Sequence, residues 1–161
     1  MNQKKTKKWL MIKLPIVYFL LMYVLCCSSN NNISSLNESD VFKIIDNKMA
    51  LQESSWNNGN LEAFMLPYWK SDSLMFIGKS GITKGWNKTL SNYKKSYSNK
   101  EEMGNLNLKN IDYKIIDNKS VLITGKWLLI RNNELGNLSG YYTLLWKKLN
   151  DSWVIVYDHS S

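Results

Sequence analysis

The feature that most constrains the fold is a change of periodicity near residue 105. From there onward the chain alternates apolar and polar residues with a period of two, which is typical of strands. Asn, Asp and Gly residues, which favour tight turns, separate the alternating segments. The pattern predicts a four-stranded antiparallel meander with strands near 105–116, 120–131, 139–148 and 152–159.

Helical spacing dominates the region before the meander. Val41, Ile45, Met49, Gln52 and Trp56 recur at intervals of three and four, which predicts one buried helix face. This helix is expected to begin at a capping Ser39 or Asp40 and to end at 57–59, where a glycine suits the C-cap. Two further helices are predicted at about 60–68 and 86–97, with a short strand at 73–77 and a glycine-rich loop between them.

Helices followed by an antiparallel sheet predict an α+β fold, in which three N-terminal helices cover one face of a curled sheet. The segment 120–131 is not simply polar on either face, since Val121, Ile123 and Leu129 alternate with Leu122 and Leu128. The outer sheet face is therefore also expected to be covered, for example by a second copy in a homodimer.

The first residues predict export. Five lysines precede Leu14 and no acidic residue occurs before Glu38, which is the layout of a signal peptide. The apolar run 14–25 is shorter than the roughly 20 residues of a spanning helix, so a cleaved signal is favoured over a permanent anchor. We expect a signal at 1–27, a polar tether at 28–38 and one domain at 39–161.

Both cysteines of the chain, Cys26 and Cys27, end this apolar run. A cysteine followed by a polar tether resembles a bacterial lipoprotein signal, in which the first mature cysteine is acylated. Cys27 fits better, because Val24, Leu25 and Cys26 then fill the three preceding positions; Cys26 and simple secretion remain alternatives. The resemblance implies a membrane partner through a lipid anchor on the exported side. No cysteine remains downstream, so the domain must be stable without a disulfide.

The charge of the whole chain is mostly that of the signal. The net charge is +8, but five of the 21 basic residues and none of the 13 acidic residues lie in 1–27, so the rest carries +3. Without a basic cluster we expect no nucleic-acid partner. A single histidine without thiolates predicts no metal site, and we expect no cofactor.

Several segments in order carry a family resemblance. The stretches "WNNGNLEAFMLPYWKSDSLMFIG", "GITKGWNKTLSNYKKSY", "TGKWLLI", "GYYTLLWKK" and "SWVIVYDHSS" resemble the nuclear transport factor 2-like superfamily, in its ketosteroid-isomerase-like and SnoaL-like bacterial branch. The resemblance covers residues 40–161. It implies a cone-like, cystatin-like fold around a pocket, commonly dimeric through the outer sheet face. It implies no particular function, because this scaffold hosts enzymes, ligand binders and assembly modules.

Asp72 and His159 are the candidate catalytic residues. The resemblance implies an acid-base aspartate in or near the strand that follows Asp72, although Asp72 could instead bond to the backbone. Histidine titrates near neutral pH, but His159 could equally be the structural end of the last strand. Asp158 and His159 are adjacent on a strand and so point to opposite faces. His159 is expected to share its face with Trp153 and Ile155, lining either the cone or the dimer surface.

The domain is rich in aromatic residues, and several should line a cavity or an interface because their polar tips need partners. The candidate pocket residues are Trp56, Trp86, Tyr93, Trp127, Tyr142 and Trp146. The sequence favours an exported domain that binds a small apolar or amphipathic ligand. One alternative is an isomerase or lyase with Asp72 as general base and His159 or a pocket tyrosine polarising the substrate oxygen. The other is a dimeric assembly module.

Overall fold

The computed structural model of the chain describes residues 37–161. The expected signal peptide, the lipidation candidates Cys26 and Cys27 and nearly all of the tether lie outside the described residues. Within 37–161, no helix combines the length and the apolar character that crossing a membrane requires.

The long helix α2 (Glu38–Asn57) follows the predicted pattern, since the five residues of the expected face are all buried. Its N-cap is Asn37, whose side chain accepts a hydrogen bond from the backbone N–H of Ser39, so the cap lies slightly earlier than predicted. Gly59 follows the helix with a φ of 74°, a conformation that glycine adopts readily.

The other helices are short except for α4 (Trp86–Ser96), which matches its prediction. The helix α3 (Leu61–Phe64) ends earlier than predicted, because the chain then forms a bridge between Tyr68 and Ile155. The helix α5 (Lys100–Met103) was not predicted. Its single turn has no room for an apolar repeat.

Residues 37–161 form a sheet of six strands in the order β2-β1-β6-β5-β4-β3. The predicted meander is confirmed. Its strands are β3 (Asn105–Asp117), β4 (Ser120–Ile130), β5 (Leu138–Leu149) and β6 (Ser152–Ser160). A hairpin of β1 (Met75–Gly78) and β2 (Gly81–Lys84) extends it, with β1 parallel to β6. The prediction of a loop at 81–84 was therefore wrong.

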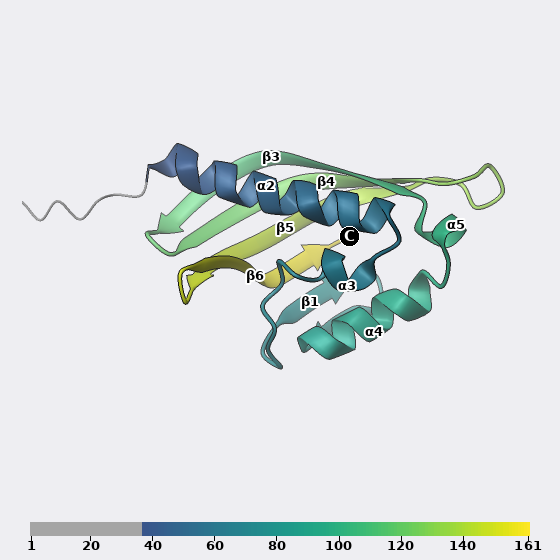
Figure 1. The fold of residues 1–161 in the computed structure, drawn as a ribbon, viewed down its shortest axis with the longest axis horizontal. Coiled ribbons are helices and arrows are strands. Elements are labelled where there is room, and N and C mark those ends of the chain that lie inside the picture. The colour runs from purple at the N-terminus through teal and green to yellow at the C-terminus, as the bar shows by residue number, and fades with distance from the viewer. Residues whose placement is uncertain (1–36) are drawn as a thin grey trace, which may run out of the picture. The chain divides into compact units, whose positions relative to one another are not determined.

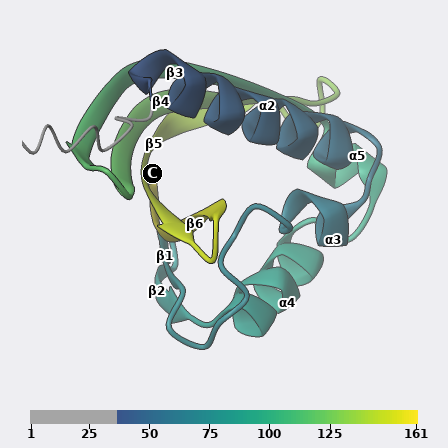
Figure 2. The same cartoon turned by 60° about the vertical axis from the view of Figure 1, so that its left-hand side comes forward.

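The sheet curls, and the helices lie on its concave side (Figure 1). In Figure 2 the sheet bends around one side of the domain, while α2, α3 and α4 close the other side. This arrangement is the predicted α+β fold with helices covering one sheet face.

Side chains of α2 form hydrogen bonds with the backbone of the edge strand β3. The Asn57 side chain accepts from the backbone N–H of Leu106 at 2.7 Å and donates to its carbonyl oxygen at 3.0 Å. One turn earlier, the Glu53 carboxylate accepts from the N–H of Leu108 at 2.6 Å. These bonds occupy backbone groups that an edge strand otherwise leaves unpaired.

A bulge in β6 changes which residues face the concave side. Ile155 pairs with Trp146 and Tyr157 pairs with Leu145, so Val156 is the extra residue. Trp153 and Ile155 are buried before the bulge, and Asp158 is buried after it. His159 is exposed on the opposite face. The expectation that His159 shares a face with Trp153 and Ile155 was wrong, because strict alternation fails at a bulge.

Candidate functional site

A cavity of about 580 Å³ lies between the concave sheet face and the helices. All six strands and α2, α3 and α4 contribute to its wall. Small-molecule pockets typically measure roughly 300–1,000 Å³. In size, the cavity therefore suits a small molecule.

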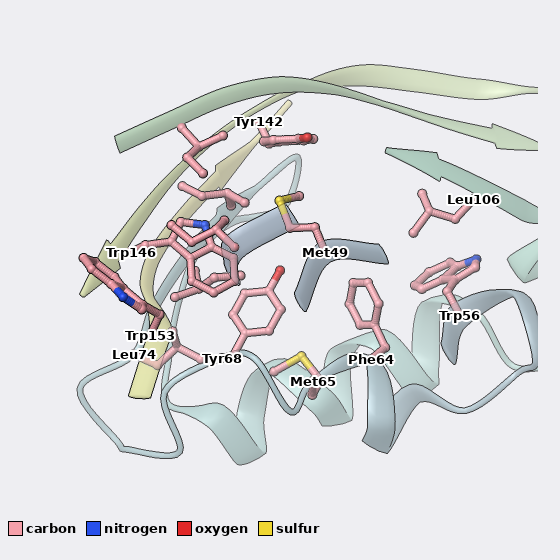
Figure 3. Packing of buried hydrophobic residues seen from close by; sticks show 14 of the residues in the cluster. Met49, Trp56, Phe64, Met65, Tyr68, Leu74, Leu106, Tyr142, Trp146 and Trp153 are labelled. Atoms are coloured by element: carbon pink, nitrogen blue, oxygen red, sulfur yellow. The ribbon is translucent and has the colours of Figure 1, made fainter. Parts of the chain in front are cut away.

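Aromatic rings form a large part of the cavity wall. Phe64 meets Trp56 edge-on with ring centroids 5.1 Å apart, and meets Tyr93 at 5.3 Å. Phe76 meets Tyr93 at 5.6 Å and Tyr97 packs on Trp56 at 4.8 Å. Such edge-to-face pairs add to area burial and hold the rings in place. Figure 3 shows Phe64 and Trp56 on one side of the interior.

Among residues 37–161, Asp158 is the one acidic residue of the cavity wall. Its side chain is buried, with 2% of the residue exposed. Its Oδ2 accepts a hydrogen bond from the Tyr68 hydroxyl at 2.6 Å, and its Oδ1 accepts from the Ser160 hydroxyl at 2.6 Å. Burial raises the pKa of Asp158 to about 6, although the Ser160 and Tyr68 hydroxyls act in the opposite direction. The group can therefore take up or release a proton near neutral pH.

Two tyrosines accompany this carboxyl group, the buried Tyr68 and the half-buried Tyr93. Burial raises the pKa of Tyr68 and of Tyr93 well above the usual value, and the nearby Asp158 charge adds to both shifts. Both phenols therefore stay protonated at neutral pH. In Figure 3 the Tyr68 hydroxyl points into the interior between the sheet and the helices.

Two buried polar atoms on the cavity wall have no hydrogen-bond partner among the described residues. The Gln52 Nε2 donates to the Phe64 carbonyl at 3.1 Å, but the Gln52 Oε1 accepts no hydrogen bond. The Trp127 Nε1 likewise finds no acceptor. Such groups cost free energy when buried unpaired, so a ligand that pairs with them would gain affinity.

The Tyr142 side chain passes over the neighbouring strand β4 at Gly125. A Cβ on Gly125 would lie 2.2 Å from the Tyr142 ring, so only glycine leaves room for it. The Tyr142 hydroxyl then donates to Asn110 Oδ1 at 2.7 Å, and Asn110 itself donates to Asp46 Oδ1 of α2 at 2.7 Å. This chain of contacts fixes the ring as part of the cavity wall.

The structure places four of the six predicted pocket residues on the cavity wall, namely Trp56, Tyr93, Trp127 and Tyr142. Trp86 and Trp146 lie elsewhere. The Trp86 indole donates to the Met65 carbonyl at 2.9 Å, and Lys70 Nζ lies 5.3 Å from its ring centroid. Trp146 is fully buried among core residues, where Figure 3 shows it near Trp153.

The two candidate catalytic residues do not line the cavity. Asp72 is exposed in the turn before β1, next to the backbone of Gly85. His159 is exposed on the outer sheet face, opposite Thr143 of β5. The structure therefore does not bring Asp72 and His159 together in the cone.

Sequence reasoning missed Asp158, Tyr68 and the free Gln52 oxygen as cavity groups. Gln52 carried a signal, since it is the one polar residue on the otherwise apolar face of α2. Asp158 was placed opposite its neighbour His159, and which of the two points inward was left open; the bulge at Val156 puts Asp158 on the inward face with Trp153 and Ile155. Among residues 37–161, no group of three or more His, Cys, Asp or Glu side chains could hold a metal ion.

Comparisons with known proteins show to which family the chain belongs. No protein-family model matches the chain, and no curated protein matches it. A crystal structure of an NTF2-like protein of unknown function from Shewanella oneidensis MR-1 is 38% identical, with a TM-score of 0.70. The match covers 74% of this chain and 98% of that protein. The chain belongs to the NTF2-like family.

More distant structures share the fold of this NTF2-like domain. An NTF2-like superfamily protein from Salmonella enterica serovar Typhimurium LT2 is 19% identical over 77% of this chain and 92% of its own, with a TM-score of 0.60. A type 2 hexachlorocyclohexane dehydrochlorinase is 13% identical over 78% of this chain and 87% of its own, with a TM-score of 0.63. At these identities the likeness concerns the fold alone.

Proposed function

We propose that this NTF2-like domain binds a small apolar or amphipathic ligand in the cavity between the sheet and the helices. The observation that carries the proposal is a cavity of about 580 Å³ whose wall is rich in aromatic rings and whose lining surface is mostly apolar. Apolar walls with a small number of placed polar groups are typical of ligand pockets. Gln52 and Trp127 of the cavity wall each carry a buried unpaired atom, Oε1 and Nε1, and a ligand that reaches them would gain one acceptor and one donor.

A thermal-shift screen of the full-length chain tests this proposal. A ligand that binds only the folded state raises its melting temperature, with a gain of about 2.7 kcal/mol at a concentration of 100 times Kd. The screen uses small apolar and amphipathic compounds. A shift that Trp127→Ala abolishes and His159→Ala preserves supports the cavity, because His159 lies on the outer face. No shift across the library would contradict the proposal.

A proton-transfer enzyme of isomerase or lyase type is the second candidate function. The observation that favours it is the buried carboxyl group of Asp158, which touches the Tyr68 hydroxyl on the cavity wall. Asp158 would act as general base, and a phenol such as Tyr93 would polarise a substrate oxygen. Asp158 takes the role proposed for Asp72, since Asp72 does not line the cavity.

The pH dependence of turnover separates this enzyme from a simple binding protein. A base with a pKa of about 6 loses its activity as the pH falls below that value. Asp158→Asn should abolish turnover of a bound compound, while Asp72→Asn should leave it unchanged. Activity that survives in Asp158→Asn would exclude Asp158 as the base.

Export and lipid anchoring remain proposals that rest on the sequence of residues 1–27. The run of lysines, the short apolar segment and Cys27 support a lipoprotein signal. In this arrangement the domain would work on the exported side of a membrane, tethered by a polar segment.

We also propose a homodimer through the outer sheet face. Leu145 pairs with Leu122 on one side and with Tyr157 on the other, and these side chains are only half-buried. A second copy on this face would cover an apolar strip at the centre of the sheet. His159 lies on the same face, next to Tyr157.

A further inference from the structure

The charge of the cavity is not balanced by the described part of the chain. Each oxygen of Asp158 accepts one hydrogen bond from a neutral hydroxyl. The ion pairs within residues 37–161 are Lys94 with Glu62 and Lys148 with Asp151, and neither involves Asp158. An ionised carboxylate that is buried without a cation is costly.

Within the part of the chain that the structure describes, the groups that surround Asp158 do not supply a buried positive charge. Tyr68, which precedes β1, Tyr93 of α4 and Tyr142 of β5 bring neutral phenols near it. His159 is its neighbour on β6 but is exposed on the opposite sheet face. Lys79 contributes to the cavity wall from the β1–β2 turn, where it is exposed.

The remaining polar and aromatic groups of the wall suit a cation. The Gln52 Oε1 is a buried acceptor without a donor, so it offers a second oxygen to a ligand N–H. The rings of Phe64, Phe76 and Tyr93 lie together on the wall. Aromatic faces attract ammonium groups within about 6 Å of the ring centroid. A carboxylate, a free carbonyl oxygen and aromatic rings together favour a positively charged donor over a neutral or anionic group.

We propose that the cavity selects amphipathic amines: an ammonium group pairs with Asp158, and the apolar body of the ligand packs against the aromatic wall. The Gln52 Oε1 offers a further acceptor for ligand N–H groups. This inference rests on the proposed function of the cavity as a ligand pocket and names the chemical class of its ligand.

Two probes of nearly equal shape test the inference. 2-Phenylethylamine carries an ammonium group, and 2-phenylethanol replaces it with a neutral hydroxyl. We expect calorimetric titration of the full-length chain at pH 7.5 to show the amine binding at least about tenfold more tightly, as a charge-assisted hydrogen bond implies. Asp158→Asn should remove this preference. Asp72→Asn is the matched control, since this exposed aspartate lies outside the cavity, and it should keep the preference.

The wild-type chain provides a second test, which does not depend on the folding of a variant. As the pH falls from 7.5 to 5, Asp158 becomes protonated while the amine stays charged, so the amine affinity should fall and the alcohol affinity should not.

Each outcome has one meaning. Equal binding of the two probes would overturn the inference and leave the ligand pocket intact. A preference for the amine that survives in Asp158→Asn, or at pH 5, would overturn the assignment to Asp158. Failure of both probes and of every compound in the thermal-shift screen would overturn the ligand pocket and the inference with it.

Discussion

Asp158 links the cavity to the stability of the fold. Its pKa rises from 3.8 to about 6 on folding because burial disfavours the charged form. The folded state therefore holds this proton more tightly than the unfolded state does. The contribution of Asp158 to stability is most favourable below pH 3.8 and declines as the pH rises to about 6. The full difference amounts to about 3 kcal/mol.

Asp158→Asn removes this titration. We expect the free energy of unfolding of the wild type, relative to the variant, to fall between pH 4 and 6 and to level off above pH 7. Urea denaturation of both proteins at each pH measures the difference, and other titrating groups cancel in it. A difference that stays constant with pH would show that Asp158 is not buried as a perturbed acid.

Gly125 is a second residue whose contribution to stability follows from one contact, that with the Tyr142 ring. A methyl group there would overlap the ring of Tyr142, so Gly125→Ala should destabilise the domain by about 1–3 kcal/mol. Urea denaturation measures this loss. Combining it with Tyr142→Leu should cost less than the sum of the two single changes, because the overlap is then absent. If the double variant loses the sum of the two single losses of stability, the proposed overlap between residue 125 and the Tyr142 ring is contradicted.

At the scale of elements, the position of α2 depends on its contacts with β3. Asn57→Ala leaves the backbone N–H and carbonyl of Leu106 without their partners, which we expect to cost about 1–3 kcal/mol. Hydrogen exchange should show faster exchange of the Leu106 amide. The neighbouring Asn58→Ala is the control, because this exposed side chain makes no such contact. Equal effects of the two changes would argue against the Asn57 contact.

The sequence predicted elements well where the periodicity was long and local. The face of α2 and the strands of the meander repeat over 9 to 20 residues, so the pattern averages over single exceptions. The hairpin of β1 and β2 has only four residues per strand. Its pairing with β6 depends on contacts about 80 residues away in the chain, which no local pattern contains.

The candidate site was harder to predict than the fold. A cavity residue is defined by the direction of one side chain, and one extra residue in β6 reversed that direction for Asp158 and His159. Aromatic composition found the ring-lined wall, but it could not distinguish Trp127 on the wall from Trp146 in the core. Both positions require a large apolar residue.

At the scale of the whole molecule, the proposed anchor depends on one thiol. Cys27→Ser should release the chain from the membrane fraction of cells that export it, because acylation needs the cysteine sulfur. Cell fractionation with detection of the protein measures the change, and Cys26→Ser is the matched control. Release by Cys26→Ser alone would assign the anchor to Cys26. If both single variants and the double variant stay in the membrane fraction, an uncleaved apolar segment at 14–25 is favoured as the anchor.

A charged substitution on the outer sheet face tests whether this face is the interface of the proposed homodimer. Leu145→Lys places a charge in the apolar strip between Leu122 and Tyr157, and a charge at the centre of an interface costs desolvation free energy. We expect sedimentation or light scattering to show a dimer for the wild type and a monomer for this variant. Leu51→Lys is the control, since Leu51 is exposed on α2, which lies on the concave side of the sheet, and the dimer of this variant should persist. A wild-type monomer at high concentration would exclude the dimer. Because the cavity lies on the concave side, ligand binding should survive in Leu145→Lys.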